Sequence, residues 1–580
     1  MLKRVPVVQM IAGYKPRWLP KDLVAGLVLT AILVPQGMAY AELAGLPAIT
    51  GLYTSIFCLV GYAALGPSRI LVLGPDSSLG PMIAATILPL VGADGSPARA
   101  VELASMLAIL VGATMILAGV AKLGFVADLL SKPTQIGYMT GLALTIVVGQ
   151  LPKLFGFSVH SDNLIGDITG FVDGIRKNEV VTAAILIGVF GLIMMLVLQR
   201  WLPKVPGVLV AVVLSIGAAV LFDLADHGVA LVGTLPQGLP PFTAPSVSFS
   251  DLGLLVAGAL GISLVALTDT ISTASVFASR NGDELQANQE MIGIGAANVA
   301  AGFFQGFPVS TSGSRTAVAE RSGAKTQVTG LIGAGVIVLM LVVVPGLFRN
   351  LPQPTLAAVV ITAAISLADL AGMQRLWQIR RTEFALSLAA FSGVALLGVL
   401  PGIAIAVGLS ILNVFRRSWW PYSAVLGRVK GLPGYHDIVT HRDAEEVEGL
   451  VIFRFDAPLF FANSRAFREQ VRALAASKPA PRWIVVAAEP ITDVDTTAAA
   501  MLEDLDQTLN GEGISLVFAE MKDPVRAKID RYELTRTIDV THFYPTIESA
   551  VSAFPRLPLI EQGDPSDGQD ENDNRDGARD

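Results

Sequence analysis

The sequence predicts an α-helical polytopic membrane protein of fourteen segments, arranged as two inverted seven-segment repeats and followed by a soluble α/β domain. Three observations support this fold class. Hydrophobic residues make up 52% of the 580 residues and charged residues only 15%, whereas about a quarter of the residues in soluble proteins are charged. Two proline-containing interruptions recur at the spacing that also separates two polar residues in apolar runs. Charged residues become frequent only after residue 435, which indicates a second part that folds in water.

Long apolar runs define the membrane part, which we place at residues 22–420. Most runs approach the ~20 helical residues that cross a bilayer core of ~30 Å. Two of the segments are short. The predicted segments are 22–44, 47–66, 76–91, 100–121, 134–151, 179–199, 207–225, 251–277, 288–305, 312–321, 327–346, 354–371, 382–399 and 401–416.

The distribution of basic residues predicts the orientation in the membrane. An even number of segments places both termini on one side, and the N-terminal segment 1–21 carries five lysines and arginines. Lys and Arg in short loops favour the cytoplasmic side. We therefore expect a multi-pass protein of a bacterial inner (cytoplasmic) membrane with both termini in the cytoplasm. Loop 152–178, with Lys153, Arg176 and Lys177, is an exception to this pattern.

Two membrane segments are interrupted by a proline that small hydroxyl residues follow. Residues 74–78 read Gly-Pro-Asp-Ser-Ser, and residues 307–315 read Phe-Pro-Val-Ser-Thr-Ser-Gly-Ser-Arg. Each sequence predicts an extended approach and then a half-helix that begins inside the membrane. There, hydroxyl groups would cap the free N–H groups of the first turn.

The two interruptions occupy matching positions of a duplicated unit. Pro75 and Pro308 are 233 residues apart (308 − 75), and so are Gln36 and Asp269 (269 − 36). A unit of seven segments is odd in number, so the second copy has the opposite orientation in the membrane. Paired interrupted segments in two halves are the sequence feature that best marks a transporter's binding site.

The two half-helix ends favour an anion as the ligand. Each helix N-terminus carries about half a positive charge and unpaired N–H groups. Arg315, just inside the second half-helix, adds a full charge at membrane depth, where a charged residue is a functional candidate by default. The alternative for Arg315 is a structural ion pair with Glu320 or Asp76.

The first predicted segment offers two hydrogen-bond donors to an oxyanion. Gln36 and Tyr40 are spaced i,i+4 and share one face of a helix. Pro35 and Gly37, which flank Gln36, would equally mark only a kink.

Two carboxylates are candidates for coupling anion movement to a cation. Asp269 and Thr273 are also spaced i,i+4, so they would hold Na⁺ together, or Asp269 would take up H⁺. The alternative is a buried, hydrogen-bonded carboxylate without a coupling role. Asp76 is a favourable residue at a helix N-terminus, yet it would repel a bound anion unless it is protonated. Asp76 is therefore a candidate for a second proton carrier.

Seven short motifs in the membrane part form a specific combination. They are Pro35-Gln36-Gly37-Met38-Ala39-Tyr40-Ala41, Ala44-Gly45-Leu46-Pro47, Gly51-Leu52-Tyr53, Gly66-Pro67-Ser68-Arg69, Gly74-Pro75, Ser314-Arg315-Thr316-Ala317 and Gly323-Ala324-Lys325-Thr326-Gln327. With these motifs the chain resembles the SulP transporters, bacterial and plant relatives of animal solute carrier family 26, nearly to residue 556. It departs from the family at Ala48 and Thr50, where a proline and a tyrosine are usual, and at Asp76, where a neutral residue is commoner.

The resemblance implies a core domain and a gate domain, an elevator-type alternating-access mechanism, and commonly a homodimer. Family members carry sulfate, bicarbonate, chloride, nitrate or dicarboxylates. Residues 307–312 are similar to those of actinobacterial sulfate permeases, which favours sulfate. In family terms, Asp269 and Thr273 would hold the coupling ion. The anion would be held by Ser77, Ser78, Ser312, Gly313, Ser314 and Arg315.

After a linker at 421–435, residues 436–556 have the pattern of a small α/β domain. Strands are expected at 450–455, 483–488 and 515–519, alternating with helices near 464–476, 496–510 and 524–531. The region resembles a STAS domain, the module that SulP carriers share with anti-sigma-factor antagonists. Thr496 and Thr497 stand where antagonists carry a phosphorylatable residue, although Thr496 would equally cap the helix that follows. The acidic tail 557–580 is expected to be disordered.

These features together predict a secondary active transporter of an inorganic anion, most of all sulfate, coupled to H⁺ or Na⁺. Bicarbonate or a dicarboxylate is the alternative substrate, and an uncoupled anion channel, a nucleobase-type carrier and a non-transporting sensor are alternative functions. The sequence has no nucleotide-binding loop, catalytic triad spacing or metal-ligand cluster, so we expect no enzyme activity and no cofactor. The expected partners are the anion, membrane lipid, a second copy of the chain and a cytoplasmic protein at the STAS domain, and not nucleic acid.

Overall fold

The computed structural model describes residues 6–92, 95–125, 130–159, 161, 163–202 and 205–554, apart from the Asn281 side chain. The acidic tail 557–580, for which the sequence predicts disorder, lies outside the described residues. The chain divides into two compact units, Met1–Ile411 and Leu412–Asp580, and each unit is described by itself.

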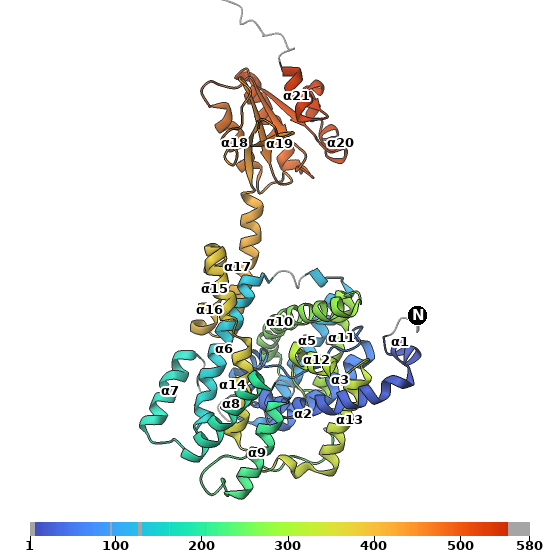
Figure 1. The fold of residues 1–580 in the computed structure, drawn as a ribbon, viewed down its shortest axis with the longest axis vertical. Coiled ribbons are helices and arrows are strands. Elements are labelled where there is room, and N and C mark those ends of the chain that lie inside the picture. Colours follow the sequence, from blue (N-terminus) through green and yellow to red (C-terminus); the bar gives the residue numbers. More distant parts are fainter. Residues whose placement is uncertain are drawn as a thin grey trace, which may run out of the picture. The chain divides into compact units, whose positions relative to one another are not determined.

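The first unit is helical, and each of the fourteen predicted segments contains a helix (Figure 1). Seven of the described helices are long and apolar enough to cross a membrane, and α4, α9 and α13 are shorter apolar helices. The count of fourteen crossings itself stays a prediction. The helices are α2 (Leu19–Leu43), α3 (Ala48–Leu65), α4 (Gly80–Val91), α5 (Pro97–Val120), α6 (Lys132–Leu154), α8 (Thr182–Trp201), α9 (Gly207–Leu221), α10 (Phe249–Asn281), α11 (Ala287–Phe303), α12 (Gly313–Arg321), α13 (Val328–Val343), α14 (Gln353–Leu367), α16 (Arg381–Leu397) and α17 (Val399–Trp419).

Three further helices were not predicted: α1 (Pro6–Gly13), α7 (Leu164–Arg176) and α15 (Leu370–Ile379). They are short and amphipathic, so they lack the long apolar runs that mark a membrane crossing. Helix α7 shows the pattern, because its exposed apolar side chains recur at helical spacing, at Ile165, Ile168, Val172 and Ile175. It lies within loop 152–178, the loop whose basic residues depart from the expected distribution.

A glycine contact explains one of the sequence motifs. A Cβ atom on Gly51 of α3 would lie 1.9 Å from the carbonyl oxygen of Gly37 on α2. Because no side chain fits there, glycine is required where the two helices cross. Helix α2 continues through Pro35 and is not interrupted at this motif.

The second unit contains a six-stranded sheet in the order β4-β3-β5-β6-β7-β8. Strands β5 to β8 are parallel, while β3 pairs antiparallel with both β4 and β5. The expected strands β5, β6 and β7 are confirmed, and segment 421–435, assigned to a linker, contributes β3 to this sheet. The strands are β3 (Ser423–Arg428), β4 (Tyr435–Asp437), β5 (Leu450–Phe455), β6 (Trp483–Ala487), β7 (Ser515–Ala519) and β8 (Phe543–Tyr544).

Helices cover both faces of this sheet, and the strand residues alternate between two cores. Ile484 and Val486 pack in the core that includes α18 (Ser464–Ala475), α19 (Thr496–Gly511) and α20 (Asp523–Arg531). Trp483 and Val485 pack in the core under the short helix α21 (Ile547–Ala553). The three expected helices are confirmed, which gives the unit its own two-layered core (Figure 1).

One buried carboxyl in this unit predicts a pH dependence of stability. Burial raises the pKa of Asp506 on α19 to about 6, although Asn510 donates a hydrogen bond to it at 2.9 Å. The unfolded chain releases this proton near pH 4, so the folded state loses stability as pH rises from about 4 to 6. Asp506→Asn should therefore stabilise the unit by about 2 kcal/mol at pH 7 and hardly change it at pH 4.

Urea unfolding of a fragment from Leu412 onward at the two pH values measures this difference. Asp504→Asn is the matched control, because Asp504 is exposed and pairs with Arg468 at 2.8 Å. An equal effect of Asp506→Asn at both pH values would contradict the prediction.

Candidate functional site

The two interrupted segments meet in the fold and pair with each other. Strand β1 (Leu73–Gly74) runs antiparallel to β2 (Ser310–Thr311), with Leu73 opposite Thr311. The backbone N–H of Ser312 donates to the carbonyl of Val72 at 3.1 Å. Helices α4 and α12 follow these strands and begin 233 residues apart (313 − 80). The predicted duplication therefore brings two helix N-termini to one small sheet.

The two helix ends are capped by different chemistry. At α12 the Ser312 hydroxyl accepts from the N–H of Arg315 at 3.4 Å, as the hydroxyl-cap prediction requires. Before α4 the Asp76 carboxylate takes this role, accepting from the N–H of Ser78 at 2.9 Å and from its hydroxyl at 2.7 Å. The prediction of hydroxyl caps is wrong for this first end, because a carboxylate competes better for N–H donors.

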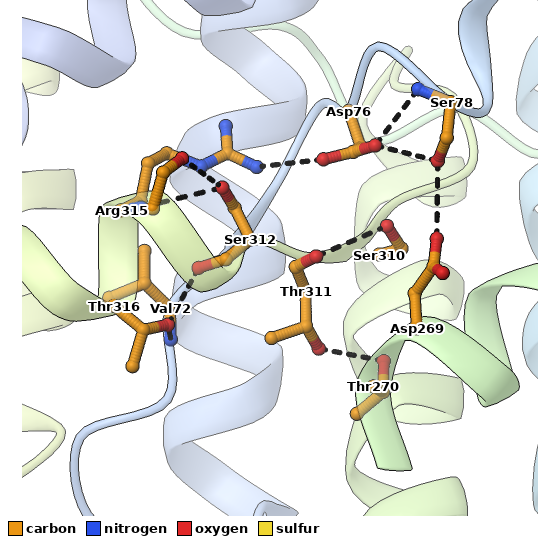
Figure 2. A network of polar contacts seen from close by, with 11 residues as sticks. Val72, Asp76, Ser78, Asp269, Thr270, Ser310, Thr311, Ser312, Arg315 and Thr316 are labelled. Carbon is orange, nitrogen blue, oxygen red and sulfur yellow. Dashed lines mark hydrogen bonds and ion pairs between the residues drawn. The ribbon is translucent and has the colours of Figure 1, made fainter. Parts of the chain in front are cut away.

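Arg315 places a buried positive charge between these two ends (Figure 2). Its side chain is 1% exposed, and none of its guanidinium nitrogens has a hydrogen-bond partner among the described residues. Asp76 approaches it at 3.8 Å, which is an ion pair but too long for a hydrogen bond. Glu320, the other expected partner, pairs instead with Arg280 at 3.8 Å. The guanidinium therefore has N–H donors to offer to a ligand.

Helix α10 brings Asp269 to the same place. The Ser78 hydroxyl lies 3.3 Å from the Asp269 carboxylate, and the Thr270 and Thr311 hydroxyls are 2.7 Å apart, which joins α10 to β2. Thr273 lies beside α12, because a Cβ on Gly313 would sit 3.7 Å from the Thr273 hydroxyl. The fold thus brings the predicted coupling residues next to the predicted anion residues.

The remaining predicted residues lie at differing depth in this site. Tyr40 is buried on α2 and close enough to Asp76, Arg315 and Ser77 to interact with them electrostatically. Gln36, one turn earlier, is half-buried and has no hydrogen-bond partner among the described residues. Ser314 is exposed at the start of α12, and its hydroxyl lies 3.1 Å from that of Ser312.

Several supporting residues were not predicted, because their partners are distant in sequence. Asn298 on α11 is fully buried; its side chain accepts from the N–H of Val309 at 2.9 Å and donates to the Val309 carbonyl at 3.2 Å. Thr316 accepts from the N–H of Val72 at 3.0 Å, and Thr54 accepts from that of Phe307 at 3.1 Å. These side chains pair backbone groups that the short strands leave unpaired.

Removing one of these supports should weaken both the fold and the site. Asn298→Leu leaves the Val309 N–H and carbonyl buried without partners, at a cost of about 1–3 kcal/mol for each group. We expect a lower unfolding temperature in detergent and little uptake activity. Asn288→Leu is the control, since Asn288 on the same helix accepts from the N–H of Gly124, far along the chain from the site. Equal uptake by the two variants would contradict this role of Asn298.

In the second unit, Asp495 and not Thr496 caps α19. The Asp495 carboxylate accepts from the N–H groups of Ala498 and Phe461, each at 2.8 Å. Thr496 and Thr497 are exposed in the first turn of the helix. The alternative in which Thr496 is the cap is therefore wrong, and both hydroxyls stay candidates for modification.

Comparison with known proteins shows two matching families. A profile of the sulfate permease family matches residues 19–390, and one of the STAS domain matches residues 441–550. A probable sulfate transporter of Mycobacterium tuberculosis is 41% identical over 552 residues, which cover 95% of this chain and 98% of the relative.

Solved structures show the same fold at lower identity. The murine anion transporter Slc26a9 in its inward-facing state is 24% identical, with a TM-score of 0.87, over 96% of this chain and 94% of the other. The transmembrane domain of the cyanobacterial bicarbonate transporter BicA is 23% identical, with a TM-score of 0.60, over 68% of this chain and 99% of the other. The Slc26a9 similarity extends over nearly the whole chain and therefore includes both units.

Proposed function

This chain belongs to the sulfate permease family, and from this membership we propose that it is a secondary active transporter of sulfate, coupled to H⁺ or Na⁺. It is a multi-pass membrane protein and a transporter, not an enzyme. The observation that carries the proposal is the buried guanidinium of Arg315, whose N–H donors face no acceptor at hydrogen-bond distance. An oxyanion would supply these acceptors between two helix N-termini.

Packing within the first unit suggests how the site changes sides. Helix α11 packs against α3 and α5, and α13 packs against α2 and α3, so these helices form one group around the site. Helices α14 and α16 pack against α6, and α8 packs against α9 and α14, which forms a second group. We propose an elevator-type alternating access in which the group with the site moves against the other.

Asp269 is the proposed coupling residue. Its carboxylate lies one hydroxyl away from the half-helix α4 and on the helix that carries Thr273. Either a proton on Asp269 or a sodium ion between Asp269 and Thr273 would compensate a charge of the anion.

The remaining assignments follow the same family membership. The relative in M. tuberculosis supports a bacterial inner membrane as the location, and the basic N-terminal segment supports cytoplasmic termini. We also propose a homodimer, surrounded by membrane lipid, whose STAS domain binds a cytoplasmic protein. Thr496 and Thr497, exposed at the start of α19, are the proposed regulatory positions of that domain.

Uptake of radiolabelled sulfate into proteoliposomes tests the proposal. An inward pH gradient and an inward Na⁺ gradient are applied in turn, with bicarbonate, fumarate and nitrate as unlabelled competitors. We expect uptake that follows one gradient and that unlabelled sulfate blocks best. No sulfate uptake under either gradient would refute sulfate as the substrate, and the blocking competitor would replace it.

A further inference from the structure

The Ser78 hydroxyl lies between two carboxylates. Its oxygen is 2.7 Å from Asp76 and 3.3 Å from Asp269, and Figure 2 shows the three side chains in a row. A hydroxyl has one proton to donate and two lone pairs that accept. The shorter contact assigns the Ser78 proton to Asp76. The contact with Asp269 is then a hydrogen bond only if Asp269 itself carries a proton and donates it to the Ser78 oxygen.

This assignment balances the charges of the site without a ligand. Arg315 contributes one positive charge and Asp76 one negative charge, while the protonated Asp269 is neutral. Asp76 also faces the guanidinium, with 3.8 Å between the nearest atoms. The carboxylate of Asp76 therefore stands beside the group that the proposed function assigns to the transported anion.

We propose that Asp76 is a built-in counter-anion of Arg315, which a transported anion replaces when a proton passes from Asp269 to Asp76 through Ser78. The O–H bond of Asp269 breaks as its proton moves to the Ser78 oxygen, and the former Ser78 proton moves to Asp76. Asp76 becomes neutral and releases Arg315 to the anion. Asp269, now charged, takes up one proton from water, so each anion binds together with one proton.

Other polar groups around this row fit the transfer. Tyr138 of α6 is near both carboxylates, and its buried hydroxyl has no hydrogen-bond partner among the described residues. Gln135 and Lys132, also of α6, face Asp269. Tyr40 of α2 interacts with Asp76, and Cys58 of α3 lies near Arg315. Because α6 belongs to the second helix group, the charge on Asp269 would act across the boundary at which the two groups move.

The inference rests on the proposed anion transport, and sulfate affinity measured against pH tests it. In the purified full-length protein, sulfate should bind up to about tenfold more tightly for each unit that the pH falls, since one proton is taken up. Asp76→Asn should bind sulfate at least about tenfold more tightly at pH 7.5, because no carboxylate competes for Arg315. Its affinity should hardly depend on pH.

Two further variants test the proton path. Ser78→Ala should slow uptake driven by a pH gradient about tenfold, while sulfate affinity at fixed pH changes much less. The control Thr86→Ala removes a buried hydroxyl of α4 that bonds only to the carbonyl of Met82, and it should retain the wild-type rate. A wild-type rate in Ser78→Ala would overturn the path.

The failures can be told apart. If Asp76→Asn has the same or weaker affinity, or keeps the wild-type dependence on pH, the counter-anion role is wrong while anion transport stands. If the wild-type protein binds none of sulfate, bicarbonate, nitrate and chloride, the proposed function fails and this inference fails with it.

Discussion

Replacing Arg315 by alanine should lower sulfate affinity about a hundredfold, because charge-assisted hydrogen bonds to an oxyanion contribute about 1.5–3 kcal/mol each. The substitution also removes the guanidinium that faces Asp76 at 3.8 Å. Without it the site contains the charge of Asp76 and only the partial charges of the two helix ends, and these do not attract a second anion. Radiolabelled sulfate binding to the purified variant, with uptake in proteoliposomes, measures the loss.

Two variants control for nonspecific effects of losing a positive charge. Arg280→Ala removes an exposed arginine that pairs with Glu320 at 3.8 Å, and it should bind sulfate as the wild type does. Arg315→Lys keeps the charge but not the planar set of donors, so we expect an intermediate affinity. Wild-type affinity in a folded Arg315→Ala protein would show that the anion binds elsewhere.

Replacing Asp269 by asparagine should abolish accumulation of sulfate against its gradient, with a loss of about tenfold or more in uptake driven by pH or Na⁺. Asparagine is similar in shape and keeps a hydrogen bond to Ser78, but it neither takes up a proton nor attracts a cation. Anion binding should persist, since Arg315 and the two helix ends remain.

Parallel assays of gradient-driven uptake and of sulfate exchange at equilibrium separate these two effects. Asp251→Asn is the matched control, because Asp251 lies in the first turn of the same helix α10 and pairs with Arg99. We expect it to keep gradient-driven uptake. Unchanged gradient-driven uptake in Asp269→Asn would refute the coupling role of this carboxylate.

Much of the fold could be predicted because it depends on patterns that are local along the chain. Apolar runs located a helix in each of the fourteen segments, and short β-branched runs located β5, β6 and β7. The constant spacing of 233 residues between Pro75 and Pro308 located the two half-helices before any contact between them was known. The motif of small hydroxyl residues also located the cap at Ser312.

The errors have a common physical origin. Helices α1, α7 and α15 are short and have one polar face, so average hydrophobicity hides them. Strand β3 has its partner, β5, more than twenty residues further along the chain, and the sequence around it therefore looked like a linker. The choice of Asp76 over the neighbouring serines as the cap before α4 depends on where the N–H groups point after folding.

By itself, the sequence determined that this is a membrane protein with a soluble α/β domain, two half-helices and an anion as its expected ligand, because hydrophobicity, proline and charge act wherever they occur along the chain. Only the tertiary structure decided that β1 and β2 pair, that Asn298 completes their hydrogen bonds, and that Ser78 joins Asp76 to Asp269. These contacts join residues up to 238 positions apart (Leu73 and Thr311; 311 − 73). Hydrogen bonds and ion pairs depend on distances of a few ångströms, and the chain must fold before such distances exist.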